Sequence, residues 1–288
     1  MNINDAGTYK SRGYSSYNLG LSFEPEDMAF AEAEEFYLDG RFEDAAYKYG
    51  RAAEISSKHL GGWLGRVFAQ LAMDNVSQAE IYAEDAARQF SDHPRALSLY
   101  AYVLARRNKK EKALEKASEA YAMTKGKPSD EVKSTHACCL LLCKKHSEAQ
   151  EVLNTITVGP KNVLTMVRLA EMLINAKKYE PAGEIAHKLT LLCPTRTRIW
   201  CLDAKAWMLA GDKWRARDSA DKALEIDKNC EEAFRIKQRL GHSDSNSNSF
   251  FSKKSWLPES PEETMDSIFD LFHFFSRLLN YFSFGRWR

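Results

Sequence analysis

The stretch 162–230 carries apolar residues at helical spacing, and the same pattern occurs in it twice. The apolar positions of the first copy are Met166, Leu169, Ala170, Leu173, Ala182, Ala186 and Leu189, and those of the second are Trp200, Ala204, Trp207, Ala216, Ala220 and Ala223. Polar turns at Lys177 and Gly211 divide each copy into two stripes, and Pro194 separates the copies. Each copy therefore predicts a pair of helices. One pair cannot bury its own apolar face, so the pattern predicts a stack of pairs, which is an open solenoid.

The same period extends over most of the chain. The alanines that open each second helix are Ala45, Ala79, Ala113, Ala149, Ala182 and Ala216, spaced by 34, 34, 36, 33 and 34 residues. Seven positions after each alanine stands another small or apolar residue: Ala52, Ala86, Ala120, Ile156, Leu189 and Ala223. Five positions before each alanine stands a turn residue: Gly40, Asp74, Asn108, Lys144, Lys177 and Gly211. Together the three series predict six helix pairs.

This spacing resembles the tetratricopeptide repeat, whose period is 34 residues. Further matches are Trp63 and Trp200 near the start of their first helices, the turns Gly40-Arg41-Phe42 and Gly211-Asp212, and the closing Pro194. The resemblance covers about residues 26–230. It implies an all-α fold, a right-handed superhelix in which the first helix of each pair lines the concave side.

Two units depart from the pattern. In the second, the closing proline, Pro94, comes late, which predicts a longer second helix. In the fourth, the polar residues Lys133 and His136 stand where an aromatic residue and a leucine are usual, so this unit is the weakest of the six.

Four regions follow from these patterns. Residues 1–25 are rich in Ser, Gly and Asn without helical periodicity, which predicts a flexible arm. Residues 26–240 form the solenoid, ending in a capping helix from Glu231 to Leu240 that is stopped by Gly241. Residues 241–259 are a polar linker, and 260–288 are predicted to form a hydrophobic amphipathic helix.

The last of these regions has a narrow polar stripe in an otherwise apolar surface. Its candidate docking residues are Ile268, Phe269, Phe272, Phe275, Leu279, Phe282 and Trp287. So many exposed aromatics require a docking surface. Three alternatives stay open: a membrane-surface anchor, a helix that folds back into the groove of its own or a second copy, or an assembly helix that joins a larger complex.

Composition narrows the function classes. A formal charge of +1 over 288 residues gives no support for binding nucleic acid. The N-terminus has no apolar core of signal-peptide type. The sequence also contains no uninterrupted run of about 18 apolar residues, so it predicts no membrane-spanning helix. The six cysteines contain no CxxC motif and fall mostly in apolar stripes, which is typical of reduced core cysteines. We therefore expect a cytoplasmic location, with peripheral membrane attachment as an alternative.

No residue pattern predicts catalysis, a cofactor or a metal. His136, Cys139, Cys143 and His146 follow one helix face, but four ligands spread over about 15 Å of helix cannot close on one ion. Core packing is the favoured interpretation of these cysteines. Phosphate-binding loops, GxSxG and HExxH are also missing from the sequence. We expect a protein that is not an enzyme.

The resemblance places a partner-binding groove on the concave side. The groove residues predicted from it are Phe30, Glu34, Tyr37, Leu64, Phe68, Tyr102, Arg106, Leu141, Val167, Glu171 and Lys205. Some family members bind acidic chaperone tails through a clamp of lysine, asparagine and arginine, and the matching positions here, which include Phe30, Phe68 and Tyr102, lack it. An apolar, aromatic groove suits an amphipathic helix or an apolar peptide. The alternative is that these residues pack against neighbouring units.

The function that these patterns favour is a non-catalytic scaffold or adaptor. It would bind an apolar or helical segment of a protein partner in the concave groove, with the C-terminal helix as a membrane-surface or complex anchor. Two alternatives remain: a secretion-type chaperone that holds an apolar client segment, and an adaptor whose groove is occupied by its own C-terminal helix.

Overall fold

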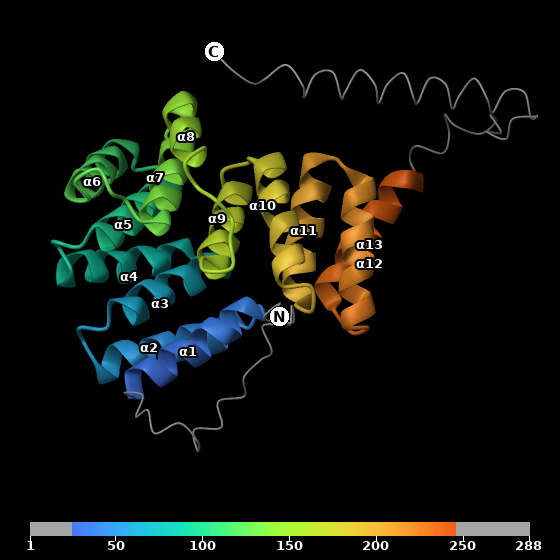
Figure 1. Cartoon of the computed structure of the whole chain (residues 1–288), viewed down its shortest axis with the longest axis horizontal. Helices are drawn as coiled ribbons and strands as arrows, with labels where there is room; N and C mark the ends of the chain where they lie inside the picture. The colour runs from blue at the N-terminus through green and yellow to red at the C-terminus, as the bar shows by residue number, and fades with distance from the viewer. Residues whose placement is uncertain (1–24, 246–288) are drawn as a thin grey trace, which may run out of the picture. The chain divides into compact units, whose positions relative to one another are not determined.

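The structure is a computed structural model that describes residues 25–245, and this part of the chain contains thirteen α-helices and no strand (Figure 1). The helices are α1 (Pro25–Leu38), α2 (Phe42–Ile55), α3 (Leu60–Ala72), α4 (Val76–Gln89), α5 (Pro94–Arg106), α6 (Lys110–Met123), α7 (Asp130–Leu142), α8 (His146–Leu153), α9 (Val163–Asn175), α10 (Tyr179–Leu192), α11 (Thr197–Ala210), α12 (Lys213–Ile226) and α13 (Glu231–Ser245). They confirm an all-α superhelix of six helix pairs followed by one more helix.

The turns inside the six pairs have a common backbone feature. All six turn residues predicted from the sequence have positive φ: Gly40 (78°), Asp74 (59°), Asn108 (62°), Lys144 (67°), Lys177 (59°) and Gly211 (90°). A residue in this left-handed conformation ends a helix and reverses the chain. It therefore sets the hairpin angle of each pair.

The small residues predicted at the helix crossings are fully buried. Ala45, Ala79, Ala113, Ala149, Ala182 and Ala216 each have 0% exposure. An alanine at a crossing lets two helices approach closely while it buries its methyl group. The large core that results runs without a break from α1 to α11, whereas the end of the row holds two small clusters, around Ile236 and around Cys201.

Three local expectations are wrong: a longer second helix in unit two, Pro94 as the end of that unit, and Gly241 as the end of the capping helix. The second helix of unit two, α4, has 14 residues, the same length as α2. Pro94 opens α5 instead of closing α4. Proline suits the first turn of a helix, where its missing N–H costs nothing. The capping helix α13 continues through Gly241 to Ser245. Gly241 has no positive φ there, and glycine inside a helix weakens it without ending it.

The weak fourth unit has a shortened second helix. α8 has only 8 residues, and the seventh-position residue Ile156 falls in the loop behind it. A cavity of about 480 Å³ opens beside this loop, with a mixed lining that includes Leu153, Leu173 and Ile185 together with Glu184 and Lys188. The missing turns of α8 therefore leave a hollow between units four and five.

The described residues up to Leu240 form one compact unit. The predicted arm 1–25, except Pro25 in α1, lies outside the described residues, as do the linker beyond Ser245 and the predicted helix 260–288 with its docking residues. Among residues 25–245, no helix has the length and apolar character needed to cross a membrane.

Candidate binding site on the inner face

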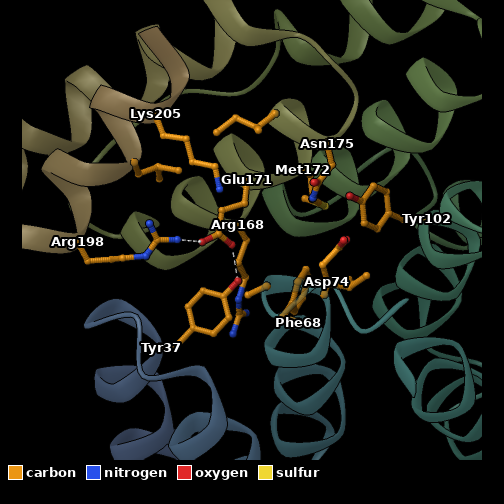
Figure 2. A pocket seen from close by; sticks show the side chains of 14 residues that line it. Tyr37, Phe68, Asp74, Tyr102, Arg168, Glu171, Met172, Asn175, Arg198 and Lys205 are labelled. Carbon is orange, nitrogen blue, oxygen red and sulfur yellow. Dashed lines mark hydrogen bonds and ion pairs between the residues drawn. The ribbon is translucent and has the colours of Figure 1, made fainter. Parts of the chain in front are cut away.

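A cavity of about 310 Å³ lies where the first helices of five units converge. Its labelled lining residues are Tyr37, Phe68, Asp74, Tyr102, Arg168, Glu171, Met172, Asn175, Arg198 and Lys205 (Figure 2). They come from α1, α3, the turn after α3, α5, α9 and α11. The cavity therefore joins positions that are far apart in the sequence.

Glu171 on α9 links two other units across this cavity. The Tyr37 hydroxyl donates a hydrogen bond to its Oε2 at 2.5 Å, and Arg198 Nη2 pairs with its Oε1 at 2.9 Å (Figure 2). Tyr37 lies in the first unit and Arg198 in the sixth. Burial, with the Glu171 carboxylate next to it, raises the pKa of Tyr37 well above its ordinary value, so the phenol stays protonated and donates.

Arg168, one turn before Glu171, is a buried cation with aromatic partners. Its side chain is only 6% exposed, and its Nη2 donates to the Tyr49 hydroxyl at 3.0 Å. The guanidinium carbon lies 4.3 Å from the centroid of Phe68 and 5.1 Å from that of Tyr37. Rings at these distances attract a cation that water does not reach. Burial raises the pKa of Tyr49 to about 12, so this hydroxyl is neutral and can accept the bond.

A glycine makes room for the hydrogen bond between Tyr49 and Arg168. A Cβ on Gly65 of α3 would lie 2.3 Å from Cδ1 of Tyr49, a distance that no packed side chain tolerates. Because position 65 has no side chain, the Tyr49 ring lies directly against the α3 backbone. From there its hydroxyl reaches Arg168 on α9.

A second link joins the first unit to the loop before α11. Arg196 pairs with Glu35 at 2.7 Å and with Asp39 at 2.8 Å. The arginine side chain is mostly buried, whereas both carboxylates are about half exposed. One arginine holding two carboxylates gives the contact a fixed geometry.

The mouth of the cavity is polar. Asp74, Asn175 and Lys205 are exposed there, and Arg106 Nη2 pairs with Asp74 Oδ1 at 2.8 Å. Among the described residues Lys205 has no ion-pair or hydrogen-bond partner, although the figure shows its side chain directed towards Glu171 (Figure 2). Tyr102 is buried, which raises its pKa to about 12, and its hydroxyl makes no hydrogen bond of good geometry within residues 25–245. Among residues 25–245 the cavity mouth thus offers one cation, Lys205, without an ion pair, above a buried hydroxyl, Tyr102, that lies near Arg106 and Asn175.

Five of the eleven predicted groove residues line this cavity: Tyr37, Phe68, Tyr102, Glu171 and Lys205. Arg106 lies beside it through Asp74, and Glu34 lies one turn before Tyr37 on α1. Phe30 packs instead against Tyr49, with ring centroids 5.6 Å apart.

The other three predicted groove residues, Leu64, Leu141 and Val167, belong to the hydrophobic core and do not line the cavity, whereas Tyr37, Phe68 and Tyr102 belong to the same core and line it. Leu64 and Val167 are 1% exposed and Leu141 is 7% exposed. The inner face is therefore not a continuous apolar surface. The concave side holds a mixed cavity whose floor is aromatic and whose wall is charged.

Sequence reasoning missed Arg168, Arg198, Asp74 and Asn175. Arg168 had a visible signal, because it is the one cation inside the largely apolar run from Met166 to Leu173, where Glu171 is the other charge. A charge at such a position needs a partner when it is buried, and only the folded chain shows which one.

Of the cysteine and histidine face of the fourth unit, Cys139 packs in the core, His136 and Cys143 are partly buried, and His146 is exposed. Cys139 is 0% exposed, and its thiol lies 3.7 Å from the Ala101 carbonyl oxygen and 3.8 Å from that of Ala113. The His136 ring stacks on Tyr121 with centroids 4.5 Å apart. Within residues 25–245, no cluster of His, Cys, Asp and Glu could hold a metal ion.

No protein-family model and no curated protein matches the chain. Solved structures with similar helix arrangements include PilW, a type IV pilus biogenesis factor, at 15% identity and a TM-score of 0.42, covering 75% of this chain and 99% of that one. A tetratricopeptide repeat protein from Parabacteroides merdae has 13% identity and a TM-score of 0.41, with 80% and 94% covered. The APC/C hetero-tetramer Cut9-Hcn1 has the same identity and TM-score, with 75% of this chain and only 42% of that one covered.

These likenesses are distant and bear on no function of this chain. The tetratricopeptide-type architecture is visible in the structure itself, in helix pairs with buried alanines at their crossings and left-handed turn residues at a period near 34.

Proposed function

We propose that this protein is a non-catalytic interaction scaffold that binds a segment of a protein partner at the inner-face cavity. One observation carries the proposal: first helices from five units converge on one cavity. At the mouth of this cavity lies Lys205, which has no ion-pair partner among the described residues. Pockets that combine apolar walls with a few polar groups are typical of ligand sites. A peptide is a ligand that suits a cavity formed between the helices of successive units.

The lining defines the chemistry of the partner segment. Phe68 and Tyr102, which are 2% and 0% exposed, form the aromatic floor against which an apolar side chain of an extended peptide or a helix would pack on entering the cavity. Lys205 offers a charge for an acidic group next to that side chain. The proposed binding residues are the predicted groove residues that line the cavity, together with Arg106 and Asn175 at its mouth.

The C-terminal segment 260–288 has a proposed role as an anchor, on a membrane surface or in a larger complex. This part of the proposal depends on the sequence pattern alone. A fragment 1–259 that leaves the membrane fraction would support the membrane anchor. A fragment that loses only a co-purifying protein would support assembly, and one that binds an apolar peptide more tightly would support occupation of the groove by the chain's own end.

The cavity is tested by two matched lysine variants. Lys205→Glu reverses the free charge at the mouth, and Lys222→Glu reverses an exposed lysine of α12 that pairs with Glu225 on the same helix. Proteins captured from cell extract by the wild type should be retained by Lys222→Glu and reduced at least about tenfold by Lys205→Glu, a loss of about 1.4 kcal/mol.

Crosslinking locates the contact. A photoreactive side chain at position 175, in the mouth, should crosslink the captured protein, and the same group at position 222 should not. Equal capture by both charge variants, with no crosslink from position 175, would overturn the proposal.

A further inference from the structure

Two cysteine thiols face each other at the C-terminal end of the solenoid. Cys201 lies on α11 and Cys230 directly precedes α13, and their Sγ atoms are 3.4 Å apart. Cys201 is 1% exposed, whereas Cys230 is half-buried and reachable from solvent. Both are free thiols in this structure. The pair therefore has one protected sulfur and one accessible sulfur in van der Waals contact.

This contact lies in a small, separate part of the core. Cys201, Ala223 and Ala233 form a small cluster between α11, α12 and α13, separate from the large core of the preceding units. Two exposed or partly exposed ion pairs reinforce it, Arg198 with Glu232 at 3.4 Å and Lys237 with Asp221 at 2.5 Å. Ion pairs at the surface add little stability. A covalent bond would therefore change the attachment of α13 more than any contact now present.

We propose that Cys201 and Cys230 form a reversible disulfide that fastens the capping helix α13 to α11. A disulfide needs its sulfur atoms about 2.05 Å apart, so the two thiols must approach by roughly 1.4 Å. Cys230 lies in the short connection between α12 and α13, where side-chain and backbone rotation can supply that movement. The bond would close a loop that contains all of α12.

The oxidant is a small-molecule disulfide such as oxidised glutathione. The Cys230 thiolate attacks one sulfur of that disulfide, forms a mixed disulfide and releases one glutathione thiolate. The Cys201 thiol then loses its proton, and its sulfur attacks the sulfur of Cys230 and releases the second glutathione. Two protein thiols are oxidised to one disulfide, and one glutathione disulfide is reduced to two thiols.

The order of the two steps follows from the surroundings. Burial is the main cause that raises the pKa of the Cys201 thiol, so this sulfur is protonated and shielded. The accessible Cys230 must react first. Once it carries glutathione, Cys201 is the neighbouring sulfur that can displace the adduct.

The test uses the full chain, incubated under native conditions with oxidised glutathione. We expect a mass loss of about 2 Da, with the peptides of Cys201 and Cys230 joined. The oxidised protein should have a melting temperature higher by roughly 5–10 °C, and amide exchange in α13 should slow at least about tenfold. Addition of a thiol reductant should reverse all three changes.

Single variants separate this pair from the other cysteines. Cys201→Ser should keep a glutathione adduct of about 305 Da on Cys230, because the resolving sulfur is gone. Cys230→Ser should give neither product, and Cys193→Ser, a buried control cysteine on the loop after α10, should behave as the wild type. A disulfide mapped to other cysteines, or a wild-type protein that keeps only glutathione adducts while its circular dichroism stays native, would overturn the proposal.

Discussion

The inner face and the C-terminal end of this solenoid are held by contacts of different range. Around the cavity, Tyr37 bonds to Glu171 across 134 positions and Arg168 bonds to Tyr49 across 119. At the end, α13 is tied to α11 by Arg198 and Glu232, which are 34 positions apart. In a simple solenoid each repeat contacts only its neighbours, and stability is a sum over adjacent pairs. Here the first unit is also bound directly to the fifth.

This difference predicts two kinds of unfolding. The first five units and α11 should lose structure together, because the inner-face contacts join the first unit to α9 and to the start of α11. The end helix α13 should open by itself, as segments with few buried contacts commonly do. Arg198 lies at the border, since one guanidinium pairs with Glu171 on α9 and with Glu232 on α13.

The largest expected effect comes from Gly65→Ala. The new methyl group would lie 2.3 Å from Tyr49 Cδ1, so the ring must move and its bond to Arg168 breaks. Overpacking plus the lost buried bond should lower the free energy of unfolding by about 3 kcal/mol in urea titrations. Gly241→Ala is the matched control, because nothing lies within 4 Å of a Cβ there. It should be neutral or slightly stabilising, and equal losses in both variants would contradict the packing argument.

Removing the buried cation comes next. Arg168→Met keeps an apolar stem but leaves the Tyr49 hydroxyl without its donor, so we expect a loss of about 2 kcal/mol. Hydrogen exchange should speed up in α1 and α2 as well as in α9, since the contact joins these units. Arg88→Met, at an exposed surface pair with Asp85, should change little. Faster exchange confined to α9 would show that the first unit is not coupled to the fifth.

At the other end of the comparison, Ile236→Ala removes a buried side chain of the small cluster under α13. Ile236 is 4% exposed and packs with Trp207 and Leu240. The loss should be about 1–2 kcal/mol, since a cluster at the edge can relax around the cavity. Exchange should accelerate in α12 and α13 and stay unchanged in α1 to α9. A uniform acceleration along the chain would remove the distinction between the two regions.

The sequence was sufficient for the local geometry of the repeats. A period near 34 located the six turn residues, all of which have positive φ, although four of them are not glycine. It also located the crossing alanines, because both features repeat in every unit and depend only on neighbouring helices. Ile156 shows where this reasoning stops: the period continued through it, but α8 had already ended at Leu153.

The site was harder to predict than the repeats. Periodicity gives the face of a helix, and the resemblance to the tetratricopeptide repeat implied that the face with Tyr37 and Glu171 is the concave one. Periodicity gives no curvature, so it could not show that the first unit comes back to contact the fifth and sixth. Arg168 was therefore not among the predicted groove residues, whereas the structure makes it the centre of that contact. Long-range pairs of this kind leave no periodic signal in one sequence.

The smallest expected effect is a pH dependence on the inner face. Burial raises the pKa of the Glu34 carboxyl above its ordinary value of 4.5, and the Arg168 charge opposes this. The folded carboxyl therefore binds its proton more tightly than the unfolded one. Between the two pKa values the folded state holds more protons, so stability falls as the pH rises through that window.

Glu34→Gln should remove this contribution, because the amide stays neutral at every pH. Urea titrations from about pH 4 to about pH 7 should show a smaller decline for the variant than for the wild type. Glu54→Gln, at an exposed pair with Arg51, should leave the decline unchanged. If the free energy of unfolding declines equally with pH in Glu34→Gln and in the wild type, the charge of Arg168 fully offsets the burial of Glu34. Arg168 would then bind this carboxylate as well as Tyr49 on the inner face.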